Sequence, residues 1–134
     1  MGVRDSARSL ATALLGLVAV ACAGGAPQRV ECERLPDDAF DRCRRVLALE
    51  WGRLEVVDPV GFRILTAWNA HVDGDRVGQK RATVFLDDRG TVVVLGEVRW
   101  IEGGLVTTPG FGEPHGDDAL TERVRAALAA VLAG

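Results

Sequence analysis

Residues 64–100 alternate between apolar and polar side chains with a period of two, and this pattern constrains the fold more than any other feature of the chain. The alternation predicts three strands joined by turns, over residues 64–72, 81–86 and 92–100. The connections contain Asp73-Gly74-Asp75 and Asp87-Asp88-Arg89-Gly90, which are residue types typical of tight turns. The pattern therefore indicates an antiparallel meander with one apolar face and one wetter face.

The alternation also assigns side chains to the two faces of each strand. In the first strand it groups Ile64, Thr66, Trp68, Ala70 and Val72 on one face. In the other two strands the wetter positions are Arg81, Thr83, Phe85, Glu97 and Arg99. We expect the apolar sets to point toward the core.

Helices are predicted on both sides of the strands in the sequence. Pro36 followed by two aspartates suits a helix start, and this helix would end at Gly52. Asp117 and Asp118 open a second helix over 119–133, and a short strand is predicted over 54–57. We therefore expect an α+β fold of two layers, in which a three- to four-stranded antiparallel meander has an N-terminal and a C-terminal helix packed on one face.

The first residues are typical of a secretory signal peptide. Arg4 and Arg8 precede Leu10–Ala21, an apolar stretch without charge. This stretch is shorter than the roughly 20 residues that a membrane-spanning helix needs. Small residues then lead directly to Cys22 in Val18-Ala19-Val20-Ala21-Cys22.

This junction resembles the lipobox of bacterial lipoproteins. The resemblance implies cleavage before Cys22, attachment of acyl chains to that cysteine and anchoring to a membrane. Because Ala23 is not aspartate, the sorting rule of the family implies the outer membrane, facing the periplasm, in an organism that has one. The alternative is an ordinary signal peptide cut after Ala21 or Ala23.

These features divide the 134 residues into three parts. We expect a signal peptide over 1–21, a lipidated tether over 22–31 and a single α+β domain over 32–134. The formal net charge is −3, which argues against nucleic acid as the main partner.

Two cysteines remain after Cys22. Export would place Cys32 and Cys43 in an oxidising compartment, where we expect them to form a structural disulfide. Cys43 shares a helix face with Leu47 and Trp51, so the bridge would pin the incoming chain to the inner side of the helix. The alternative is a redox pair, but redox cysteines usually stand closer together, as in Cys-x-x-Cys.

The sequence contains no set of residues that indicates an enzyme, a cofactor or a metal site. Its two histidines, His71 and His115, lack metal-ligand spacing, and its only serines, Ser6 and Ser9, lie in the expected signal peptide. Glycines near residue 112 precede a helix, but the aspartates at that helix start disfavour a phosphate. We therefore expect no enzymatic activity and no cofactor.

Residues 103–116 form a long predicted loop, and loops of this length are often functional. Phe111 and His115 make it the candidate binding surface. The three tryptophans, Trp51, Trp68 and Trp100, fall on predicted inward faces, where core packing is the usual role. Between two helices and a curved sheet they could instead line a cleft for an apolar ligand.

The body of the chain is similar to the small α+β modules of envelope-assembly lipoproteins such as BamC. The similarity lies in the helix and turn before the strand 61–68 and in the basic-to-apolar strand Lys80–Leu86. It implies the fold and assigns no functional residue. Our leading interpretation is a non-enzymatic envelope lipoprotein that binds another, unidentified envelope protein. The alternative is a periplasmic carrier of an apolar ligand held between the helices and the sheet.

Overall fold

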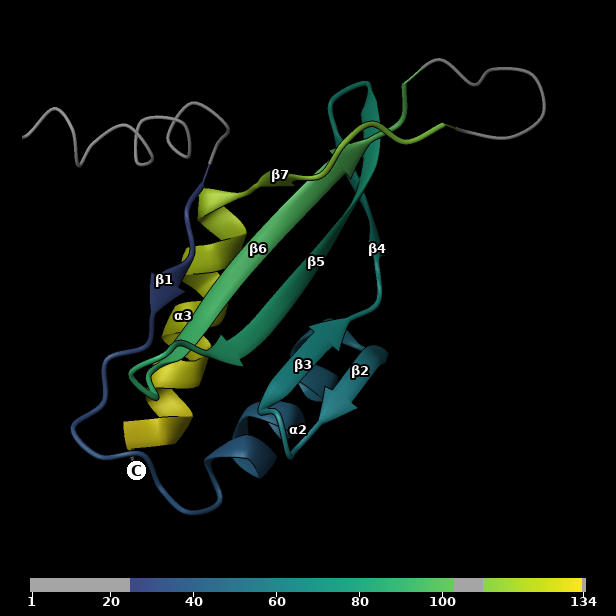
Figure 1. Ribbon diagram of the computed structural model, residues 1–134. Helices are drawn as coiled ribbons and strands as arrows, with labels where there is room; N and C mark the ends of the chain where they lie inside the picture. Colours follow the sequence, from purple (N-terminus) through teal and green to yellow (C-terminus); the bar gives the residue numbers. More distant parts are fainter. Residues whose placement is uncertain (1–24, 103–109, 134) are drawn as a thin grey trace, which may run out of the picture.

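The computed structural model describes residues 25–102 and 110–133 (Figure 1). The expected signal peptide and Cys22 lie outside the described residues. Two helices and seven strands follow one another as β1 (Gln28–Arg29), α2 (Ala39–Trp51), β2 (Leu54–Asp58), β3 (Arg63–Thr66), β4 (Asn69–Asp73), β5 (Arg76–Leu86), β6 (Val92–Trp100), β7 (His115–Gly116) and α3 (Asp118–Ala133). The fold is α+β, as the sequence predicts.

All seven strands belong to one antiparallel sheet, whose main path is β1-β6-β5-β3-β2. Strands β2, β3, β5 and β6 form the predicted meander, because each pairs with the next in chain order apart from β4. Strand β4 extends β3 along the same edge of β5, and β7 and β1 both pair with β6. The sheet therefore has more strands than the three to four expected, because the strand expected over 64–72 is divided into β3 and β4, and β1 and β7 are added at β6.

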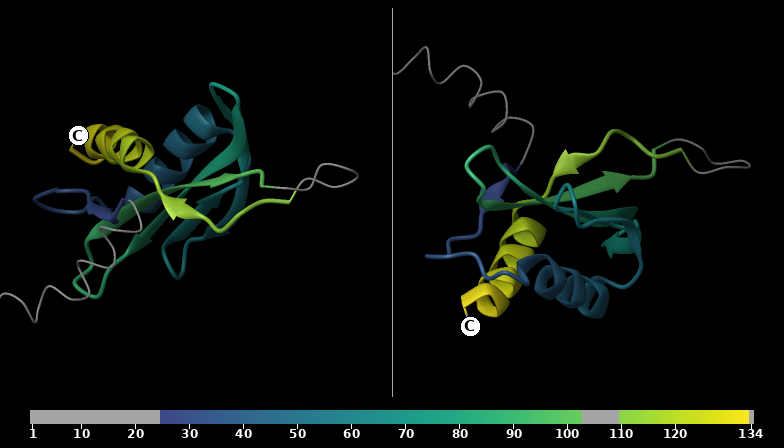
Figure 2. Two further views of the ribbon diagram at one scale, coloured as in Figure 1. Left: turned by 90° about the horizontal axis from the view of Figure 1, so that it is seen from above. Right: turned by 60° about the horizontal axis from the view of Figure 1, so that its bottom comes forward.

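Both helices lie on one side of the sheet (Figure 2). Helix α3 crosses β6 and β1, while α2 lies against β3 and β2 and also contacts α3. The core between the layers is aliphatic apart from one thiol. Its buried residues are Val30, Ala39, Cys43, Leu47, Ile64, Ala82, Val84, Val92, Val94, Leu120, Val124, Leu128 and Leu132.

Helix α2 has the predicted apolar stripe. Cys43 and Leu47 are fully buried, and Phe40 and Trp51 pack against the same cluster from partly exposed positions. The helix begins at Ala39, later than Pro36, because Asp37 and Asp38 form a turn first. It ends where Gly52 adopts a φ of +83°, a conformation that glycine reaches without steric cost.

Helix α3 is fixed to the sheet at its first turn. The Asp117 carboxylate accepts the Leu120 N–H at 3.2 Å, and Lys80 Nζ on β5 lies 2.6 Å from the same carboxylate. The Thr121 hydroxyl accepts the Gly96 N–H at 2.8 Å. A side chain at Gly96 would collide with this turn, so glycine permits the close approach of the helix to β6.

The predicted strand over 64–72 is interrupted, and this interruption corrects the predicted faces. Leu65 pairs with Thr83 and Asn69 pairs with Lys80, so three residues on this edge oppose two on β5. The extra residue is a β-bulge, which shifts every later side chain to the other face. Trp68 therefore does not share the inward face of Ile64.

The buried hydroxyl of Thr66 supports the bulge. It accepts the Ala82 N–H at 3.0 Å and donates to the Ala67 carbonyl at 3.1 Å. The Ala67 N–H donates instead to the Arg53 carbonyl at 2.9 Å. The Thr66 side chain thus accepts the hydrogen bond of a β5 backbone N–H that has no backbone acceptor where the neighbouring strand is interrupted.

The folded domain begins earlier than the expected boundary at Cys32. Of the tether expected over 22–31, residues 25–31 are described, and Gln28–Arg29 pairs with β6. Val30 is buried in the core, and its N–H donates to the Val92 carbonyl at 2.8 Å. This segment adds an edge strand to the sheet. The sequence does not predict this strand, because it has only two residues and follows Pro27.

Candidate functional site

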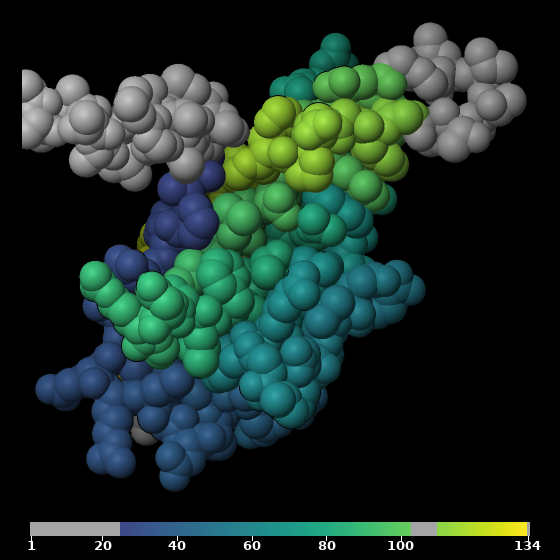
Figure 3. Space-filling model, viewed as in Figure 1, coloured from purple at the N-terminus to yellow at the C-terminus, as the bar shows by residue number. Residues whose placement is uncertain are grey.

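The side of the sheet opposite the two helices is the surface that we call the open face. It carries side chains that alternate with the buried ones along β5 and β6, and no described helix covers it. Figure 3 shows this side, where the strands β2, β3, β5 and β6 and the segment that follows residue 110 form the surface of the described domain. It is the wetter face that the sequence predicts, since it holds Arg81, Thr83, Phe85, Glu97 and Arg99.

Two neighbouring rungs between β5 and β6 carry charged side chains at one end of the open face. Arg81 opposes Glu97, and its Nε lies 3.0 Å from the Glu97 Oε1. Arg99 opposes Gln79 and donates to its Oε1 from Nε at 2.9 Å and from Nη2 at 2.6 Å. The first guanidinium thus faces a carboxylate, whereas the second faces a neutral amide.

Aromatic rings hold both guanidinium groups. The Cζ atoms of Arg81 and Arg99 lie 4.3 and 4.1 Å from the centre of the Trp68 ring. The Cζ of Arg99 also lies 4.3 Å from the Phe111 ring. Guanidinium groups stack favourably on aromatic faces, so these contacts restrict the arginine rotamers. We call these side chains the arginine–aromatic cluster: Trp68, Gln79, Arg81, Glu97, Arg99 and Phe111.

Apolar side chains gather on the neighbouring rungs of the open face, where Arg63 pairs with Phe85 and Arg29 pairs with Val93 at their margin. Val56, Leu65, Thr83 and Leu95 stand opposite one another in a row across β2, β3, β5 and β6, and each is partly exposed. The next rung adds the partly exposed Phe85 and the buried Val93. We call this the apolar patch: Val56, Leu65, Phe85, Val93 and Leu95.

A groove adjoins the apolar patch at the β1 edge of the sheet. It encloses about 540 Å³, and its lining includes Pro27, Phe85 and Val93. Arg29 and Asp87 at its rim form an ion pair, with 3.0 Å between Nε and Oδ2. Hydrogen bonds from the Thr91 N–H and from Arg29 hold the pKa of the Asp87 carboxyl below its ordinary value.

Phe111 and His115, predicted as one binding loop, lie on opposite sides of the sheet. Phe111 forms a bridge with Ile101 and contacts Arg99 on the open face. His115 belongs to β7 and opposes Val98, whose side chain is buried toward the helices. Paired residues point to the same side of a sheet, so His115 is directed away from the open face. The structure thus joins Phe111 to a site without His115; residues 103–109 lie outside the description.

Cys32 and Cys43 are free thiols in this structure. Burial raises the pKa of the Cys43 thiol to about 12, and the neighbouring Cys32 adds to the rise. Cys32 also packs against the core cluster that contains Cys43. The disulfide expected from the sequence therefore stays a prediction, as does the attachment of lipid to Cys22.

The three tryptophans have three different environments. Trp51 packs against the core from the end of α2, and Trp68 lies in the arginine–aromatic cluster. Trp100 lies at the far end of the sheet, where its ring centre is 5.7 Å from that of His71 and 3.9 Å from the Arg76 Cζ. They do not line a common space, so their arrangement gives no support to a carrier of apolar ligands.

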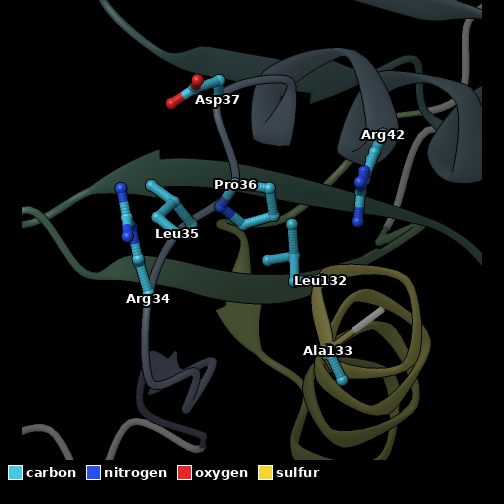
Figure 4. Close-up of a pocket in the computed structure, with 7 residues that line it drawn as sticks. All are labelled: Arg34, Leu35, Pro36, Asp37, Arg42, Leu132 and Ala133. Atoms are coloured by element: carbon cyan, nitrogen blue, oxygen red, sulfur yellow. The ribbon is translucent and has the colours of Figure 1, made fainter.

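A second cavity lies at the ends of the two helices (Figure 4). It encloses about 350 Å³ between the segment 34–37 and the end of α3. Its one inward arginine from α2, Arg42, is engaged in the fold: Nη1 donates to the Val131 carbonyl at 3.0 Å, and Nε lies 2.8 Å from Asp38 Oδ1. Arg42 therefore caps the C-terminus of α3, and we assign this cavity a structural role.

Within residues 25–102 and 110–133, no group of three or more His, Cys, Asp and Glu side chains could hold a metal ion. None of the described helices is both long and apolar enough to cross a membrane.

Sequence reasoning found the polarity of the open face but not the cluster on it. Arg81 and Glu97 were recognisable as wetter positions, and the turn at 87–90 sets the register that makes them partners. The alternation places Trp68 on the wrong face because a one-residue bulge does not interrupt the alternation in the sequence. The contact of Phe111 with Arg99 depends on the return of the chain after residue 109.

Comparisons with known proteins found no match to this chain among family models, curated proteins or solved structures.

Proposed function

We propose that this chain is a membrane-anchored envelope lipoprotein whose α+β domain binds another protein through the open face. The observation that carries the proposal is the composition of that face. An antiparallel sheet with one solvated face ordinarily alternates apolar inward with polar outward. Here the outward side presents the apolar patch beside the arginine–aromatic cluster.

Such a surface fits protein recognition better than solvation. The side chains of the apolar patch lie next to one another and, apart from Val93, remain partly exposed, and contiguous apolar surface marks interaction sites. Tryptophan, phenylalanine and arginine are enriched at the centres of protein interfaces. The rigid sheet holds these side chains in fixed positions, which lowers the entropy lost on binding. The lipobox-like sequence before Cys22 supports the anchoring, and the absence of a serine beyond Ser9 supports a non-enzymatic role.

The proposed binding is tested by chemical crosslinking in intact cells, followed by affinity purification and mass spectrometry. Thr83→Glu adds a charge in the middle of the open face, and Ala130→Glu adds the same charge on the exposed surface of α3. We expect the wild type and Ala130→Glu to recover one near-stoichiometric envelope protein. Thr83→Glu should recover at least about tenfold less of it, since burying an unpaired charge at an interface is costly.

Two results would contradict this assignment. If Thr83→Glu recovers as much partner as the wild type, the open face is not the docking surface. If the wild type purifies alone or with co-extracted lipid, a carrier function replaces protein binding. The anchor is tested separately: Cys22→Ser should move the protein from the membrane fraction to the soluble fraction, and retention in the membrane would refute lipidation at Cys22.

A further inference from the structure

Arg99 is held firmly in place without being neutralised. Its Nε and Nη2 both donate to Gln79 Oε1, which is the oxygen of an uncharged amide. Among the described residues no carboxylate pairs with it, whereas Arg81 on the adjacent rung pairs with Glu97 at 3.0 Å. The cluster of two arginines and one glutamate therefore has one positive charge in excess.

The surroundings of Arg99 prepare it for a ligand. Trp68 and Phe111 lie within 4.3 Å of its Cζ, and Gln79 fixes one edge of the guanidinium plane. Within the described part of the chain, Nη1 makes no hydrogen bond. A partly buried guanidinium without a counter-charge is unfavourable in the unbound protein, and an arriving anion would relieve this cost.

We propose that Arg99 binds a carboxylate on an acidic segment of the protein that docks on the open face. This inference rests on the proposed function and names the chemistry of the partner. A planar carboxylate matches the guanidinium edge that Nη1 leaves open. The single excess charge suits one carboxylate, whereas a phosphate dianion would stand beside Glu97. The apolar patch would receive the apolar residues next to that carboxylate.

The two glutamines of the chain provide a matched pair of variants. Gln79→Glu places a carboxylate next to Arg99 and reproduces the ion pair of Arg81 with Glu97, so the fold should be retained or stabilised. Gln28→Glu adds the same charge at the groove beside β1, where Gln28 pairs with Val94, five residues along β6 from Arg99. Arg99→Lys keeps the charge and removes the planar donor edge.

The probe is a dye-labelled peptide of glutamates, compared with the same peptide made of glutamines. Binding to the full-length lipidated protein in phosphatidylcholine nanodiscs is measured by fluorescence anisotropy. We expect the wild type to bind the glutamate peptide about tenfold more tightly than the glutamine peptide, and less tightly as salt is added. Gln79→Glu and Arg99→Lys should each weaken binding about tenfold, while Gln28→Glu changes it less than about twofold.

Equal binding of the two peptides, or unchanged binding by Gln79→Glu, would overturn the inference. A dimer that Gln79→Glu dissociates would also overturn it, because a second copy would then be the occupant. Failure of the proposed function would look different. The glutamate peptide would still bind more weakly to Gln79→Glu than to Gln28→Glu, but crosslinking in cells would recover no partner. Conversely, Thr83→Glu could lose the partner in cells while the wild type binds the two peptides equally. That result would support docking on the open face and refute only the role of Arg99.

Discussion

At the scale of single residues, Asp117 performs two tasks in the fold. Its carboxylate accepts the Leu120 N–H at the start of α3 and pairs with Lys80 from β5. Burial opposes ionisation of this carboxyl, but the hydrogen bonds from Lys80 and Leu120 outweigh it and hold its pKa below the ordinary value. Asp117 thus fastens the helix layer to the sheet.

The lowered pKa of Asp117 predicts how stability depends on pH. A carboxylate with a depressed native pKa stabilises the fold above its unfolded pKa of about 3.9, and this contribution is lost as pH falls through the native pKa. Asp117→Asn should therefore cost about 1–3 kcal/mol near pH 7 and progressively less below pH 4. Denaturant unfolding across pH measures the difference, with Asp88→Asn, at an exposed turn position, as control. A penalty that does not change with pH would contradict the ionic role.

Cys32 and Cys43 carry the second prediction at this scale. A pKa of about 12 makes the reduced Cys43 a poor nucleophile, which favours a structural bridge over redox exchange. We expect protein extracted from the envelope to contain the disulfide and to be more stable than its reduced form by about 3 kcal/mol. Alkylation with mass spectrometry before and after reduction tests the pairing. Two labelled thiols in freshly extracted, denatured protein would refute it.

At the scale of secondary-structure elements, the bulge between β3 and β4 decides which side chains reach the open face. Without the extra residue, Trp68 would lie on the helix side with Ile64, and Arg99 would lose one of its two aromatic contacts. The hydroxyl of Thr66 satisfies the Ala82 N–H at this point. A buried core residue thus supports the geometry of the proposed site.

Thr66→Val removes that hydroxyl with little change in shape. The Ala82 N–H would lose its acceptor, so we expect denaturant unfolding to show a loss of about 1–3 kcal/mol in the free energy of unfolding. In a variant that keeps Trp68 as its single tryptophan, the fluorescence should change as the ring moves. Thr83→Val, at a partly exposed position of the open face, should change stability by less than about 0.5 kcal/mol. Equal costs for the two substitutions, with unchanged fluorescence, would argue that the hydroxyl does not support the bulge.

The sequence predicted the elements well where periodicity alone decides them. The stripe of α2, the span of β6 and the wetter face of β5 agree with the structure because local side-chain spacing determines each. The bulge at Ala67–Trp68 was missed because one inserted residue is visible only against the partner strand. Strand β1 was missed because two residues are too few for a periodic signal, so its place depends on β6.

At the scale of the whole molecule, the N-terminal segment determines how closely the domain would be held to a membrane. Residues 25–31 belong to the fold, and Gly25 packs against Gly116 and Asp118. A lipid on Cys22 would then be joined to the domain through a span of at most about 10 Å. This link would hold the end of the domain that contains Gly25 near the bilayer, which favours a partner of the same membrane.

The central claim is that the open face is the surface where this protein meets its partner, and site-specific photo-crosslinking in living cells tests it most directly. A photoreactive amino acid replaces Thr83 on the open face or, as the control, the exposed Glu122 on α3. The account predicts that position 83 crosslinks to one recurrent envelope protein and that position 122 does not. Crosslinks to that protein from position 122 alone, or from neither position, would contradict the account.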